Sequence, residues 1–226
     1  MSVSARPPMR PAVRTVLLDL DGTLADSRPG IQASMRFMLE QMGHDPAAAG
    51  DLTWAVGPPI AVSIGTLLAK FADPRVQQGL DIYRARYSYV GLYDCAAFPG
   101  IPAMLAALRA TGRALCLATS KRRDFAERVI AHLGFGADIP TIYGALPGGG
   151  LDDKADMLRE LLRVEGYEPA GTVMVGDRLH DIEAAKANNL RSIGVLWGYG
   201  GRSELERVGA DSLAAVPADV VGLLDA

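Results

Sequence analysis

Residues 16–23 read VLLDLDGT, a short apolar run that ends in two aspartates, a glycine and a threonine. An uninterrupted run of this length is typical of a strand buried on both faces of a parallel sheet. Similar runs occupy residues 114–118, 140–144, 173–176 and 192–197, and helical patterns lie between them. This alternation predicts an α/β fold with a doubly wound parallel sheet.

The segment between the first two runs is far longer than one crossover helix requires, and it contains no convincing strand. Apolar residues recur at helical spacing over residues 31–42 and 76–90, which predicts two long amphipathic helices. Shorter helical patterns lie near residues 46–55 and over 59–71. We therefore expect an inserted four-helix subdomain at 28–95, called the cap below, and a core made of 1–27 and 96–226.

The composition is that of an ordinary globular protein, with 49% hydrophobic and 22% charged residues in 226. A net charge of −3 and the lack of a dense basic run argue against a nucleic-acid partner. No apolar stretch approaches the roughly 18 residues that span a bilayer, and the first residues lack the apolar centre of a signal peptide. We expect a cytoplasmic protein without membrane contact, and no disulfide between its two cysteines.

Acidic residues follow two of the predicted strands. Asp19 and Asp21 end the first, and Asp177 and Asp181 follow the fourth. Ligands of open α/β sheets bind at the carboxyl ends of the strands, so we expect these four carboxylates to converge there. Converging like charges require a cation or a shared proton, and hard oxygen ligands are what Mg²⁺ prefers. Solvated loop acids are the simpler alternative for either pair alone.

Two further segments carry groups suited to an anion. Thr119 and Ser120 end the second strand, where a hydroxyl and successive backbone N–H groups can face a phosphate. Lys154 opens a helical pattern, and a lysine in the first turn opposes the helix dipole unless an anion lies nearby. Taken alone, a threonine at a strand end is more often a local cap, and a lysine on a helix is usually only solvated.

Together these motifs resemble, in order, the four motifs of the haloacid dehalogenase-like phosphohydrolases: DLDGT at 19–23, Thr119, Lys154 and GDRLHD at 176–181. The resemblance covers about residues 14–201. Segments 26–31, 98–100 and 197–200 look like the phosphoglycolate phosphatase-like branch, which implies a Rossmann-like core with a helical cap. One departure is Ala155, where many relatives carry proline after the lysine, so that Lys121 is a rival for the role of Lys154.

The resemblance also implies roles for individual residues. Asp19 would attack phosphorus and form an aspartyl-phosphate, and Asp21 would act as general acid and base. Asp181 would orient Lys154 or a metal-bound water. The expected catalytic residues are Asp19, Asp21, Thr119 and Lys154; the expected Mg²⁺ ligands are Asp19, Asp21 through its backbone carbonyl, and Asp177; the expected phosphate-binding residues are Gly22, Thr119, Ser120 and Lys154.

We therefore expect a Mg²⁺-dependent phosphatase, a monomer or homodimer, acting on a small phosphate ester such as 2-phosphoglycolate. An inorganic pyrophosphatase or a 5'-nucleotidase of the same fold is the alternative. A sugar-phosphate mutase is disfavoured because Ile31 stands where such mutases carry a cap histidine, and a decayed binding scaffold would lack a motif residue. Lys121, Arg28 and the turn at 57–59 are further candidates for substrate contact.

Overall fold

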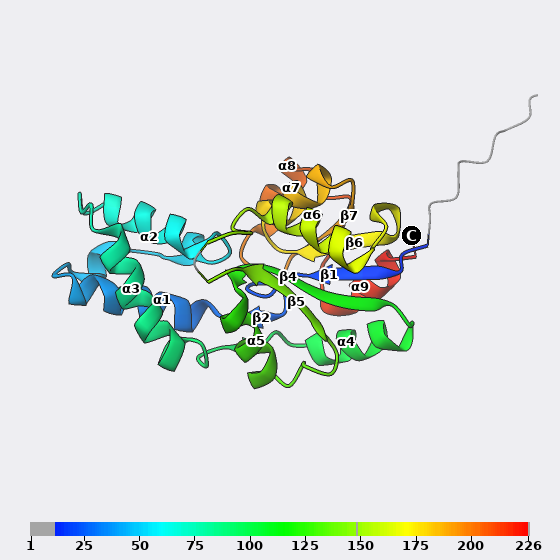
Figure 1. Cartoon of the computed structure of the whole chain (residues 1–226), viewed down its shortest axis with the longest axis horizontal. Coiled ribbons are helices and arrows are strands. Elements are labelled where there is room, and N and C mark those ends of the chain that lie inside the picture. Colours follow the sequence, from blue (N-terminus) through cyan, green and yellow to red (C-terminus); the bar gives the residue numbers. More distant parts are fainter. Residues whose placement is uncertain (1–11, 148, 226) are drawn as a thin grey trace, which may run out of the picture.

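The computed structural model describes residues 12–147 and 149–225. The first eleven residues of the expected core domain therefore lie outside the described part. Figure 1 shows a central sheet with helices on both sides and a group of helices projecting from one end of it.

The central sheet has six strands in the order β5-β4-β1-β6-β7-β8 within the described residues, and every neighbouring pair is parallel. The strands are β1 (Thr15–Leu18), β4 (Ala114–Arg122), β5 (Thr141–Ala145), β6 (Thr172–Gly176), β7 (Arg191–Val195) and β8 (Ser212–Ala214). Five of them coincide with the predicted apolar runs, which confirms the α/β fold class. The edge strand β8 was not predicted because it has three residues and is only partly buried.

Helices cover both faces of the sheet, as a doubly wound fold requires (Figure 1). Leu17 of β1 packs with the helices of one face, whereas Val16 and Leu18 join the core of the other. One face carries α6 (Lys154–Glu165) and α7 (Leu179–Ala187), with α8 (Gly201–Arg207) beside α7; the other carries α4 (Ile101–Ala110), α5 (Arg123–His132) and α9 (Pro217–Leu223). A 3-10 turn, Pro169–Gly171, leads into β6.

The cap segment contains α1 (Arg28–Gln41), α2 (Ile60–Ala69) and α3 (Val76–Arg86), and α3 runs on into a π-helical turn, Tyr87–Gly91. The expectation of a fourth helix near residues 46–55 needs correction. That stretch forms two 3-10 turns, Pro46–Ala49 and Thr53–Ala55, because Gly50 between them has φ +67° and interrupts the helical path.

The two connections between the sheet and the cap run side by side. The strands β2 (Ala25–Asp26) and β3 (Ala96–Ala97) pair antiparallel at the expected boundaries of the insertion. The division into a core at 1–27 and 96–226 and a cap domain at 28–95 stays a prediction. No helix in the described ranges is long and apolar enough to cross a membrane. Cys95 and Cys116 are free thiols.

Two glycines allow α1 to lie against the π-helical turn. A Cβ added to Gly30 of α1 would lie 1.9 Å from the carbonyl oxygen of Gly91, far inside van der Waals contact. The Gly30 N–H also donates to the Asp94 carbonyl at 3.2 Å, and the Ser34 hydroxyl donates to the Gly30 carbonyl at 2.7 Å. The position of α1 therefore depends on the absence of a side chain at residue 30.

We expect Gly30→Ala to lower the free energy of unfolding by about 1–3 kcal/mol, because the added methyl group must displace backbone. Gly222→Ala in α9 is the matched control. Its Cβ faces open space, so the same change in a helix should raise stability by about 0.5–1 kcal/mol. Urea titration followed by circular dichroism measures both values, and equal effects of the two substitutions would contradict the close approach.

Candidate active site

Three buried carboxylates meet at the carboxyl edge of the sheet. Asp19 follows β1, Asp177 follows the adjacent β6, and Asp181 lies in the first turn of α7. One carboxylate oxygen from each residue lies within 4.8 Å of the other two. None of the three residues is more than 4% exposed. The sheet order explains this convergence, because β1 and β6 are neighbouring parallel strands that end at the same level.

Glycines allow the backbone to approach these carboxylates closely. A Cβ on Gly22 would lie 2.2 Å from Asp177 Oδ2, and Gly22 has φ +91°, which other residues rarely adopt. A Cβ on Gly176 would lie 2.1 Å from Asp181 Cγ, and one on Gly198 would lie 2.3 Å from Asp177 Cβ. The carboxylates are therefore enclosed by main chain from three directions.

Lys154 is the cation of this cluster. Its Nζ donates to Asp19 Oδ1 at 2.7 Å and to Asp181 Oδ1, and its side chain is 7% exposed. Burial alone would lower the pKa of Lys154, but the carboxylates of Asp181 and Asp19 raise it above its usual value. The lysine is thus held charged beside Asp19. Lys121, the rival candidate for this role, binds Asp21 instead.

The negative charge of the cluster exceeds what one lysine neutralises. Burial raises the pKa of Asp19 to about 7, although Lys154 opposes this shift. Burial, followed by the charges of Asp181 and Asp19, raises the pKa of Asp177 well above its usual value. Asp177 accepts hydrogen bonds from the Tyr199 N–H at 2.8 Å and the Thr23 hydroxyl at 3.2 Å.

Within the described ranges, Asp177 forms no ion pair with a lysine, arginine or histidine. A fully buried carboxylate without a cationic partner is costly unless it is protonated or bound to a cation. Together with Asp19, it offers hard oxygen ligands in a pocket of main chain. These residues fit a divalent cation.

The carboxylate of Asp21 lies apart from the cluster. Asp21 Oδ1 accepts hydrogen bonds from Lys121 Nζ at 2.6 Å and from the Ser27 hydroxyl. Lys121 also donates to the Tyr87 hydroxyl, at 2.8 Å, and Tyr87 belongs to the cap. The expected convergence of four carboxylates is therefore corrected to three carboxylates around Lys154 and a fourth paired with Lys121.

The predicted phosphate-binding residues differ in what they offer. Thr119 is buried, and its Oγ1 accepts the Lys121 N–H at 3.2 Å, which is the local contact that the sequence left open. Ser120 is half-buried and lines the space beneath the cap. The Gly22 N–H donates to the Ala25 carbonyl at 2.9 Å, so it is already engaged within the turn. The contribution of Gly22 is that its lack of a side chain lets the main chain lie close to Asp177.

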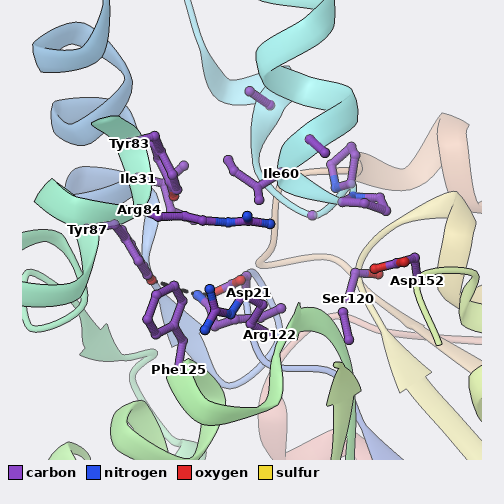
Figure 2. A pocket seen from close by; sticks show the side chains of 17 residues that line it. Asp21, Ile31, Ile60, Tyr83, Arg84, Tyr87, Ser120, Arg122, Phe125 and Asp152 are labelled. Atoms are coloured by element: carbon purple, nitrogen blue, oxygen red, sulfur yellow. Dashed lines mark hydrogen bonds and ion pairs between the residues drawn. The ribbon is translucent and has the colours of Figure 1, made fainter. Parts of the chain in front are cut away.

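A cavity of about 80 Å³ lies between the cap and the sheet edge. Figure 2 shows Asp21 and Ser120 on its floor, Ile60 above them, and Tyr83 and Arg84 entering from α3. Lys121 and the turn at 57–59 also line it, whereas Arg28 pairs with Asp26 at 3.5 Å and lies over the Tyr199 ring. A second cavity of about 570 Å³ adjoins Lys154 between α2, α6 and α7.

Comparison of the sequence with known protein families agrees with this arrangement of acidic residues. Residues 16–195 match the model of the family described as haloacid dehalogenase-like hydrolase. The chain belongs to this family. Among solved structures, a predicted phosphatase from Clostridium acetobutylicum superposes with a TM-score of 0.87 at 29% identity, covering 95% of this chain and 99% of that one.

Three curated relatives extend the comparison of this haloacid dehalogenase-like hydrolase. A 5'-nucleotidase from Pseudomonas aeruginosa is 37% identical, covering 84% of this chain and 86% of that protein. The tyrosine-protein kinase PtkA from Mycobacterium tuberculosis is 40% identical over 82% of this chain, which spans 62% of PtkA. A phosphoglycolate phosphatase from Neisseria meningitidis is 34% identical, covering 83% and 82%. The chain is a phosphatase of this family.

Sequence reasoning missed three residues that hold this hydrolase's site together. Ser27 binds Asp21, Tyr87 binds Lys121, and the Tyr199 N–H binds Asp177. Ser27 lies in segment 26–31, which resembles the family and is close to Asp21 in the sequence, so a signal for its role was available. Tyr199 lies in segment 197–200, which also resembles the family, whereas Tyr87 is 34 residues from Lys121 along the chain and only the fold brings these two together.

The burial of Asp177 predicts an unusual pH dependence for the metal-free protein. A carboxyl whose pKa is raised by folding holds its proton more tightly in the folded state, so stability is lost as pH rises above about 4. In chelator at pH 7.5, Asp177→Asn should raise the free energy of unfolding by about 1–3 kcal/mol, because the buried charge that lacks a cationic partner is removed. At pH 4 the difference should shrink.

Asp81→Asn serves as the control for this measurement. Asp81 is exposed and bonds Gln77 on the surface of α3, at 2.9 Å. Its replacement should change stability little at either pH. Denaturant titrations of the three proteins at both pH values supply the comparison, and a less stable Asp177→Asn protein at pH 7.5 would argue against an uncompensated charge.

Proposed function

We propose that the chain is a Mg²⁺-dependent phosphomonoester hydrolase that works through an aspartyl-phosphate on Asp19. The observation that carries this proposal is the position of Lys154, held by Asp19 and Asp181 beside the unpaired, buried Asp177. A carboxylate nucleophile flanked by a fixed cation and a candidate metal ligand suits phosphoryl transfer, which depends mainly on positioning and on charge neutralisation.

The proposed ligands of Mg²⁺ are the carboxylates of Asp19 and Asp177 and the backbone carbonyl of Asp21. When bound, the ion would supply positive charge that polarises the phosphoryl oxygens. Asp181 is the positioning residue for Lys154, since its carboxylate accepts a hydrogen bond from that ammonium group.

In the first step, an Asp19 oxygen forms a bond to phosphorus while the bond from phosphorus to the ester oxygen breaks. Protonated Asp21 gives its proton to the departing alcohol oxygen. In the second step, water loses a proton to Asp21 and attacks the phosphorus, which releases inorganic phosphate and restores Asp19. Splitting hydrolysis in this way uses the two aspartates for different tasks, and their separate partners support that division.

The phosphoryl oxygens would be met by Lys154, Thr119 and Ser120. The Thr119 hydroxyl accepts one hydrogen bond, and its own proton has no acceptor among the described residues, so it is available to donate to a substrate. Lys154 brings its charge to within hydrogen-bonding distance of the proposed nucleophile. These donors would oppose the charge that accumulates on phosphorus oxygens during transfer.

A small ester such as 2-phosphoglycolate is the substrate we propose. The cavity above Asp21 measures about 80 Å³, well below the roughly 300–1,000 Å³ typical of sites for drug-sized ligands. A nucleoside monophosphate is the second candidate, favoured by the relative named 5'-nucleotidase and by the 570 Å³ cavity next to Lys154. The expected cytoplasmic location, and the expected monomer or homodimer, stay predictions.

The first test is phosphate release from 2-phosphoglycolate, pyrophosphate, nucleoside monophosphates and p-nitrophenyl phosphate, with Mg²⁺ and with chelator. We expect Mg²⁺-dependent turnover and a preference for phosphoglycolate. Asp19→Asn should lower kcat by roughly 10³-fold or more, because no covalent nucleophile remains. Asp81→Asn should match the wild type. Normal turnover by a folded Asp19→Asn protein would refute the proposed nucleophile.

The two tasks of Asp21 can be separated with p-nitrophenyl phosphate, whose leaving group departs readily without a proton. Asp21→Asn should release about one p-nitrophenol per active site in a rapid burst and then slow by roughly 10²–10⁴-fold, because the phosphorylated enzyme lacks its base. Phosphoglycolate should give no burst, because its leaving group needs the acid. Stopped-flow absorbance measures the burst, and steady wild-type turnover by this variant would contradict the assignment.

A further inference from the structure

Arg84 of α3 enters the cavity from the cap. Figure 2 shows its side chain extending across the space between Ile60 and Asp21. Its Nε is buried and has no hydrogen-bond partner. The same is true of the Nε of Arg86 on the same helix, but of these two residues only Arg84 lines the cavity. The guanidinium forms no ion pair with any of the residues that the structure describes. A buried, unpaired donor of this kind is costly, and where one occurs it requires an explanation.

The other cations that line the cavity have carboxylate partners. Lys121 pairs with Asp21 at 2.6 Å, and Arg122 binds both oxygens of Asp124 at 2.9 and 2.8 Å. The remaining acidic residue of the lining, Asp152, lies beside Ser120 at the side away from Arg84 (Figure 2). Arg84 therefore brings to this cavity a positive charge that has no carboxylate partner among the described residues.

The surroundings of Arg84 suit an anion. A guanidinium presents its donors in a planar fork that matches a carboxylate or phosphate with two parallel hydrogen bonds. Ile31 and Ile60 line the same cavity, and apolar walls strengthen an ion pair by excluding water. Arg84 also lines an outer groove with Arg122, Arg128 and Asp124, in which basic side chains outnumber acidic ones.

We propose that Arg84 is a specificity-determining residue that binds a second anionic group of the substrate, a carboxylate, while the phosphoryl group lies at Asp19. This inference rests on the proposed phosphatase function and narrows its substrate to small phosphate esters that carry a carboxylate. The cavity that Arg84 shares with Asp21 and Ser120 measures about 80 Å³ and would hold the carboxylate end of such a molecule. Arg84 comes from the cap, so it also makes the cap a part of substrate recognition.

The test compares two esters that differ in one group, 2-phosphoglycolate and 2-hydroxyethyl phosphate, in the presence of Mg²⁺. Wild-type enzyme should favour phosphoglycolate in kcat/KM. Arg84→Met should reduce this preference by roughly 10–100-fold, the loss expected for a charge-assisted hydrogen-bonded pair, mainly through KM. Arg84→Lys should retain part of the preference, because it keeps the charge but loses the fork.

Arg86→Met is the matched control. Arg86 lies on the same helix, its guanidinium lies over the Phe37 ring at 4.9 Å, and it does not line the cavity. Arg86→Met should leave the preference for phosphoglycolate at the wild-type value. Thermal melting checks that all variants are folded. An unchanged preference in Arg84→Met would overturn the assignment.

Two results with the wild type separate this inference from the proposed function. Hydrolysis of p-nitrophenyl phosphate without hydrolysis of phosphoglycolate would overturn the role of Arg84 while leaving the phosphatase proposal intact. Failure to hydrolyse any ester with Mg²⁺ would overturn the proposed function and the assignment of Arg84 together.

Discussion

Three carboxylates share one lysine at the carboxyl edge of the sheet, and the rest of the site is arranged around this excess of buried negative charge. Asp19 and Asp181 bind Lys154, whereas the donors to Asp177 among the described residues are all neutral. Glycines at 22, 176 and 198 let the main chain close around the group, so water has little room to screen it. Such a cluster binds a proton or a cation favourably, because either one reduces the repulsion between the carboxylates.

Much of this arrangement followed from the sequence because parallel strands end at one edge. The apolar runs located five strands, and the acids after two of them identified the cluster. The direction of the Asp21 side chain could not be inferred from strand alternation, because β1 ends at Leu18, before Asp21. The N–H groups of residues 23–25 donate to the Leu20 carbonyl, so Asp21 lies in a turn. The short strand β8 has too few residues for a periodic pattern to mark it, and the helical pattern at 46–55 is interrupted at Gly50.

The two lysines lie in different parts of the site and bind different aspartates. Lys154 lies with Asp19 and comes from the core helix α6, whereas Lys121 lies with Asp21 and binds the cap residue Tyr87. The proposed nucleophile, Asp19, is therefore bound by a lysine of the core. The proposed acid and base has a partner that depends on the cap. This asymmetry could not be read from the sequence, where both lysines simply follow strands or open helices.

The cap has a second contact with the same machinery. Arg178, directly after Asp177, donates to the cap carbonyl of Val56 at 2.5 Å and pairs with Glu204 at 2.9 Å. Gly57 lies against the Arg178 side chain, where a Cβ would lie 3.0 Å from its Cγ. Each part of the site thus has a neighbour that touches the cap. Because the strength of every charge interaction here depends on the exclusion of water, the position of the cap sets the electrostatics of both aspartates at once.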